Sequence, residues 1–194
     1  LVPRPSIARR ANQAGIVISC MYALFSLGAH TYADQLFKRH LADQGLTVQD
    51  SITGATPFNT LLWRHVALTK TDILVGYFSI IGDDPQHPVR FDRVPRNQHL
   101  LDNIKTQRNV RAIQWFSKGF WIAQEKGDQL VMSDLRFGEF RQHDTDPPDQ
   151  WQYIFAWQIS SDPDVLVQQV QDIRDTGAAF RSLWRRLSGK HLQP

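Results

Sequence analysis

Cysteine is nearly absent from this chain, since Cys20 is the only one among 194 residues. A single thiol excludes an internal disulfide and any zinc site built from several cysteines. The sequence also has no His-Glu-x-x-His motif, no Gly-x-Ser-x-Gly motif and no phosphate-binding glycine loop. These absences remove the best-marked signatures of metalloproteases, serine hydrolases and nucleotide-binding proteins.

The chain also lacks a strong excess of charge. Its formal net charge is +3 at pH 7, which is too small to indicate a nucleic-acid partner. The basic residues are scattered along the chain, apart from Arg9–Arg10 and the group Arg181, Arg185 and Arg186. A membrane surface explains these two groups as well as a nucleic acid would, because anionic headgroups attract arginine side chains.

The seven histidines are dispersed along the sequence. His30 and Asp34 are four residues apart and share a helix face, but they make only one pair. A catalytic metal normally takes three protein ligands. We therefore expect this chain alone to hold no metal ion.

An uncharged run covers residues 11–33, which contain no Lys, Arg, Asp or Glu. Its length is on the scale of the about 20 residues that a helix needs to cross a bilayer. Arg9–Arg10 precede it, where cytoplasmic anchoring charges lie in bacterial membrane proteins. Gly15, Ser19 and Ala23 recur every four residues and form a small-residue face on which another helix can pack. Two interpretations stay open: a membrane-spanning or membrane-docked helix, and a buried helix of a globular domain.

Hydrophobic periodicity divides the chain into a long N-terminal helix, residues 1–44, and an α+β domain, residues 45–194. The helix is the candidate membrane anchor, and Gly45 is expected to end it. Strand patterns in mid-chain, with helices before, between and after them, predict a mainly antiparallel sheet with flanking helices. Strands are expected at 46–52, 60–68, 73–81, 89–94, 120–124, 130–135 and 152–159, and short helices at 97–106, 109–117 and in the tail after residue 161.

The segment Pro57–Arg64 contains the first candidate site residues. Asn59 is expected to close a turn, and Arg64 lies within an otherwise apolar strand pattern. An arginine in such a setting needs a carboxylate, phosphate or carbonyl partner, because burying a lone charge is costly. Alternatively, Arg64 lies on an exposed face or pairs with a structural aspartate.

Asp134 and Arg136 form the second candidate group. They are two residues apart in a strand pattern, so we expect them to share a face. We also expect Asp134 to pair with Arg64 across a sheet. Such a group either binds an anion or zwitterion or braces the fold. Asn59, Arg64, Asp134 and Arg136 are therefore the candidate substrate-binding residues, and no catalytic residue is assigned.

Four segments together carry a resemblance to a known family: Pro57–Arg64, Val75–Ser79, Trp115–Phe120 and Ser133–Gly138. The chain resembles, over about residues 10–140, the C-terminal part of the bacterial inner-membrane proteins called membrane-bound metal-dependent hydrolases. The resemblance implies several membrane helices before this chain. It also implies a divalent metal in the full-length protein, held by a His-Arg and Thr-His-Ser motif in the N-terminal membrane half, which this sequence does not contain.

Two hypotheses about function follow from these observations. The first is the C-terminal domain of a membrane-bound metal-dependent hydrolase, which covers or gates a metal centre in the missing membrane half or binds a substrate headgroup. The second is a non-enzymatic, membrane-tethered binding or sensor domain. The side of the bacterial inner membrane that holds the domain is left open, because Lys38–Arg39 offsets part of the arginine bias before the uncharged run.

Overall fold

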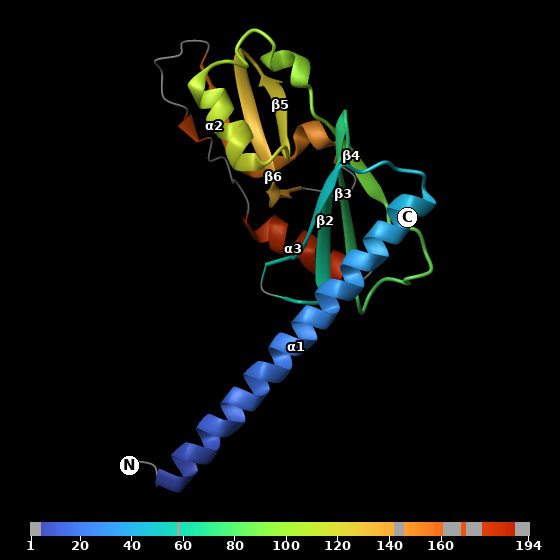
Figure 1. Ribbon diagram of the computed structural model, residues 1–194, viewed down its shortest axis with the longest axis vertical. Helices are drawn as coiled ribbons and strands as arrows, with labels where there is room; N and C mark the ends of the chain where they lie inside the picture. Colours follow the sequence, from blue (N-terminus) through green and yellow to red (C-terminus); the bar gives the residue numbers. More distant parts are fainter. Residues whose placement is uncertain (1–4, 58, 142–145, 161–167, 170–175, 189–194) are drawn as a thin grey trace.

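Two four-stranded antiparallel sheets pack face to face, and a helix covers the outer face of each (Figure 1). The structure is a computed structural model, and it describes residues 5–57, 59–141, 146–160, 168–169 and 176–188. The first sheet, sheet A, has the order β1-β2-β3-β4, and the second, sheet B, has the order β5-β6-β7-β8. The elements are α1 (Pro5–Asp43), β1 (Asp50–Ala55), β2 (Leu62–Leu68), β3 (Asp72–Ser79), β4 (Phe91–Pro95), η1 (Gln98–Leu101), α2 (Arg108–Ser117), β5 (Trp121–Lys126), β6 (Gln129–Phe140), η2 (Pro148–Gln150), β7 (Gln152–Ile159), β8 (Gln168–Gln169) and α3 (Thr176–Leu187).

Strand β2 is buried on both faces, which explains why its sequence is an almost continuous apolar run. Trp63 packs against α1, whereas Val66 and Leu68 enter the core between the sheets. Successive side chains of a strand point to opposite faces, so Arg64 lies on the same face as Val66. The one charged residue of β2 is therefore directed into the space between the two sheets.

The core between the sheets consists of branched aliphatic and aromatic side chains. Burial of each such side chain contributes about 1.5–3 kcal/mol relative to an exposed position. Backbone and side-chain hydrogen bonds add a direct link, because Ala123 N–H donates to the Arg96 carbonyl and Asn97 Nδ2 donates to the Ala123 carbonyl, both at 3.0 Å. The core residues are Val66, Leu68, Ile73, Val75, Val94, Phe120, Ile122, Leu135, Trp151 and Tyr153.

The second half of α1 covers the outer face of sheet A. Ala33, Leu36 and Phe37 lie on one helix face and are buried against this sheet. The Phe37 ring stacks on the ring of His65, with 4.8 Å between the ring centroids. On the opposite side of the molecule, Val110 of α2 packs against the outer face of sheet B.

The first half of α1 projects beyond the domain (Figure 1). Residues 9–25 are exposed, and burial against sheet A begins at Ala29. The uncharged, projecting residues 11–28 form a rod of about 27 Å at 1.5 Å per residue. Within the described part of the chain, α1 is the one helix that is long and apolar enough to cross a membrane.

The expected α+β class with a long N-terminal helix is confirmed, and α1 ends one residue before the predicted boundary. Gly45 adopts the left-handed conformation, with φ of +66°, and Leu46 N–H donates to the Leu41 carbonyl. This helix-ending turn keeps Leu46 and Val48 out of the sheet, so β1 begins at Asp50 instead of residue 46.

The strands also divide into two sheets rather than one, because hydrophobic alternation shows which side of a strand is buried but not which strand lies next to it. The short helix expected at 97–106 is limited to η1 in its regular part. Of the two helical segments expected in the tail, the second corresponds to α3. The first lies mostly outside the described residues, and its described part, Gln168–Gln169, is strand β8 on the edge of sheet B instead of a helix.

The two halves of α1 should differ in their contribution to stability. Phe37→Ala should reduce the free energy of unfolding by about 3–5 kcal/mol, because it empties a buried position against sheet A. Phe25→Ala, the matched change at a half-exposed position, should change it by less than about 0.5 kcal/mol. Urea unfolding of the detergent-solubilised chain measures both, and equal losses would contradict the division of α1 into packed and projecting halves.

Candidate functional site

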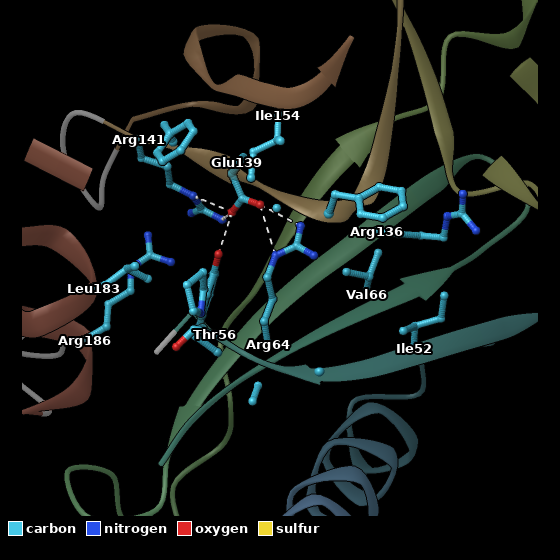
Figure 2. Close-up of a pocket in the computed structure, with 17 residues that line it drawn as sticks. Ile52, Thr56, Arg64, Val66, Arg136, Glu139, Arg141, Ile154, Leu183 and Arg186 are labelled. Carbon is cyan, nitrogen blue, oxygen red and sulfur yellow. Dashed lines mark hydrogen bonds and ion pairs between the residues drawn. The ribbon is translucent and has the colours of Figure 1, made fainter. Parts of the chain in front are cut away.

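A fully buried carboxylate, Glu139, lies between the sheets and is held by two arginines (Figure 2). Its Oε2 accepts hydrogen bonds from Arg64 Nε at 3.1 Å and Nη2 at 2.6 Å. Its Oε1 accepts from Arg141 Nε at 3.0 Å, from Arg141 Nη2 at 2.7 Å and from the Tyr77 hydroxyl at 2.9 Å. Arg64 and Tyr77 belong to sheet A, and Glu139 belongs to β6 of sheet B. These four residues, here called the ion cluster, therefore join the two sheets.

Further contacts extend the ion cluster, from Arg141 to Trp151 and Asp92 and from Tyr77 to Arg186. The Arg141 guanidinium lies 3.4 Å from the ring centroid of Trp151, and its Nη1 donates to Asp92 of β4. The guanidinium of Arg186, on α3, lies 4.1 Å from the ring centroid of Tyr77. Planar guanidinium groups stack on aromatic faces while their N–H groups bind carboxylates, which suits them to buried sites.

A bulge in β6 places Glu139 in this position. The register between β6 and β7 shifts between Asp134 and Glu139, and Gly138 adopts a φ of +102°. A positive φ of this kind is accessible to glycine but strained for other residues. The bulge bends the strand and sets Glu139 opposite Tyr153, whose ring belongs to the core between the sheets.

The arginines keep Glu139 ionised. Burial alone raises the pKa of the Glu139 carboxyl, but the charges of Arg64, Arg141 and Arg186 outweigh this effect and lower the pKa to about 2. Burial, followed by the charge of Glu139, raises the pKa of the Tyr77 hydroxyl, so that Tyr77 stays protonated and can donate its hydrogen bond. At neutral pH the cluster is a set of positive side chains around one negative charge.

A cavity of about 160 Å³, here called the inter-sheet cavity, borders the ion cluster (Figure 2). Its charged lining consists of one glutamate, Glu139, and four arginines from β2, β6, α3 and the residue after β6. Figure 2 shows Leu183 and Arg186 reaching it from the helix side, while Arg64 extends from β2 toward Glu139. The apolar part of the wall includes Ile52, Val66, Phe137, Ile154 and Leu183.

The inter-sheet cavity depends on the absence of a side chain at Gly54. Gly54 of β1 is directly opposite Arg64 of β2, and directly opposite residues place their side chains on the same face. A Cβ atom at Gly54 would meet nothing within 4 Å. Open space therefore lies beside Arg64, whose Nε and Nη2 are bound to Glu139.

The predicted pair between Arg64 and Asp134 is wrong. Arg64 binds Glu139, and the Asp134 carboxylate instead accepts hydrogen bonds from Arg136 Nε at 3.0 Å and Nη2 at 2.6 Å. The reason is the face on which each side chain lies. Asp134 is opposite Trp121, which packs on the α2 side of sheet B, whereas Arg64 of sheet A points into the space between the two sheets. The expectation that Asp134 and Arg136 share a face is confirmed by their hydrogen bonds.

The structure also places the remaining candidates. Arg64 and Arg136 line the inter-sheet cavity. Asn59 closes the β1–β2 turn as expected, because its Oδ1 accepts from the backbone N–H groups of Leu61 and Leu62. Its Nδ2 donates to the hydroxyl of Thr56, which lines the cavity. A binding role for the four candidates stays a prediction.

Glu139, Arg141 and Tyr77 are site residues that were not predicted from the sequence. One local signal was present, since a glycine inside a strand pattern often marks a bulge, and Gly138 precedes Glu139. Glu139 also lies four residues after the buried Leu135 on β6, and an even spacing along a strand predicts that both side chains lie on the same face. No comparable signal marks Tyr77, because its role depends on contacts between the sheets.

His30 and Asp34 meet at Thr53 on β1. The Thr53 hydroxyl donates to Asp34 Oδ1 at 2.7 Å, and His30 Nε2 lies 3.2 Å from the Thr53 carbonyl oxygen. These contacts attach α1 to sheet A. Among the described residues, no group of three or more His, Cys, Asp or Glu side chains is placed to hold a metal ion.

Comparison with known proteins gave no match to a family model, to a curated protein or to a solved structure. The resemblance to membrane-bound metal-dependent hydrolases therefore stays a prediction.

Glu139→Gln should reduce the free energy of unfolding by about 3–5 kcal/mol at neutral pH, because it leaves Arg64 buried without its carboxylate and Arg141 with Asp92 alone. The folded pKa of about 2 lies below the ordinary 4.5, so this contribution is complete above pH 4.5 and is lost as pH falls toward 2. Urea unfolding between pH 4.5 and pH 2 should show that the difference in unfolding free energy between parent and variant decreases as the pH falls. Glu125→Gln, at an exposed position of β5, is the control, and its unfolding free energy should differ little from that of the parent at every pH. A difference between parent and Glu139→Gln that does not depend on pH would contradict an ionised Glu139.

Proposed function

We propose that this chain is a membrane-tethered binding domain whose inter-sheet cavity takes a small amphipathic carboxylate. The observation that carries the proposal is the combination of apolar walls with buried arginines around a cavity of about 160 Å³. Ligand sites in proteins are mostly apolar, with a few polar groups that fix the orientation of the ligand. The cavity has this composition.

The size and the charge of the cavity limit the ligand class. A cavity of about 150 Å³ holds a benzene-sized group. The guanidinium groups of Arg64, Arg141 and Arg186 lie around the one glutamate of the lining and favour an anion, whereas Arg136 is bound to Asp134. Planar carboxylates match the geometry of a guanidinium group. An aromatic or branched organic acid of the size of benzoate satisfies both limits.

The membrane attachment is supported by the form of α1. The projecting residues 11–28 are uncharged and about 27 Å long, close to the about 30 Å of a hydrocarbon core. Packing against sheet A begins at Ala29, directly after this segment. A domain anchored in this way lies against the membrane surface. By resemblance, this membrane is the bacterial inner membrane.

The hydrolase activity implied by the same resemblance stays a second proposal. Its metal ligands would come from the membrane helices expected before this chain. The domain would then cover that centre or hold a substrate carboxylate, which is compatible with ligand binding in the inter-sheet cavity.

Gly54→Val tests the binding site. The new side chain enters open space and adds a residue that favours strands, so the fold should be retained. It occupies the space beside Arg64 and should raise the Kd for benzoate at least about tenfold, or about 1.4 kcal/mol. Isothermal titration calorimetry measures the Kd, and benzyl alcohol, which lacks the charge, should bind more weakly than benzoate.

Ser51→Val is the matched control. Ser51 lies three residues before Gly54 on the same strand. Side chains at an odd spacing point to opposite faces, so the Ser51 side chain faces away from the cavity. This variant should bind benzoate like the parent. Equal affinity of both variants, or equal affinity for acid and alcohol, would show that the inter-sheet cavity is not an anion site.

A further inference from the structure

Helix α3 presents a basic and aromatic face to solvent. Trp184 is 71% exposed, and Arg181 and Arg185 are also exposed, one turn before it and beside it. The opposite face contributes Leu183 and Arg186 to the inter-sheet cavity. The helix contains no Asp or Glu. An amphipathic helix with arginines around a tryptophan is typical of segments that lie in a membrane interface.

The position of α3 agrees with this composition. Helix α1 reaches sheet A near Trp63, whose ring centroid lies 5.5 Å from that of His30. Trp63 of β2 is opposite Phe78 of β3, which is the residue before Ser79. The hydroxyl of Ser79 donates to the carbonyl of Leu187 at 2.6 Å and holds the last turn of α3. Figure 1 shows α3 on the side of the domain from which the first half of α1 projects.

We propose that the face of α3 formed by Arg181, Trp184 and Arg185 docks on an anionic phospholipid surface. The proposal rests on the membrane attachment of α1 and does not depend on ligand binding. Charge complementarity identifies the partner, since each arginine near an anionic bilayer strengthens attachment about fivefold. Tryptophan adds an amphipathic ring that prefers the depth of the headgroups. Docking would also place one wall of the inter-sheet cavity next to the lipid.

Site-specific fluorescence in nanodiscs tests the docking. The full chain with Cys20→Ser receives one cysteine, either W184C or K105C, and each is labelled with an environment-sensitive nitrobenzoxadiazole probe. The Lys105 side chain is 63% exposed, and the residue lies in the turn before α2. Figure 1 shows α2 at the end of the domain away from the projecting half of α1. In nanodiscs that contain phosphatidylglycerol, headgroup spin-labelled lipid should quench the probe at position 184 severalfold more than the probe at position 105. Adding R181E and R185E should remove this difference.

Each alternative outcome is distinguishable. A chain that does not remain with the nanodiscs overturns the membrane attachment and the docking together. A retained chain with equal quenching at positions 184 and 105 overturns the docking alone. Quenching at position 184 that persists with phosphatidylcholine alone, or in the charge-reversed variant, excludes an anionic partner. A blue-shifted probe that lipid does not quench indicates a protein surface on α3 and also overturns the proposal.

Discussion

The carboxylate of Glu139 is the constraint on which the joint between the two sheets depends. Arg64 approaches it from sheet A and Arg141 from the end of β6, and neither guanidinium can be buried there without a negative partner. The carboxylate uses both oxygens, one for each arginine, and Tyr77 adds a fifth hydrogen bond. A buried network of this kind fixes the relative position of the sheets more narrowly than apolar packing alone.

The same network explains why a cavity persists beside it. Apolar side chains can shift to fill a space, but the arginines are held by their hydrogen bonds to Glu139. Gly54, directly opposite Arg64, supplies no side chain to fill the gap. A structural brace and a binding site are therefore not exclusive here, because the brace holds the guanidinium groups in the arrangement that an anion would need.

Helix α1 combines two environments in one continuous element. Its second half has the apolar stripe of an ordinary surface helix, with Ala33 and Phe37 against sheet A. Its first half is largely apolar and exposed, with no charged residue between Ala11 and Gly28, and it meets the length and hydropathy of a helix that could cross a membrane. The uncharged run is thus divided: residues 11–28 project from the domain, and the buried-helix interpretation applies to its last part, where Ala29 begins the core.

The sequence by itself determined the elements: the long helix, most strands, the turn at Asn59 and the need of Arg64 for a partner, because these depend on local periodicity, on glycine and on the cost of burying charge. Only the tertiary structure decided that Glu139, 75 residues away, is that partner. Strand alternation places a side chain on a face, but the division into two sheets and the bulge at Gly138 decide what that face meets. The ion cluster and the inter-sheet cavity are formed by residues of both sheets, and the sequence pattern of a single strand does not show which residues of the other sheet it will contact.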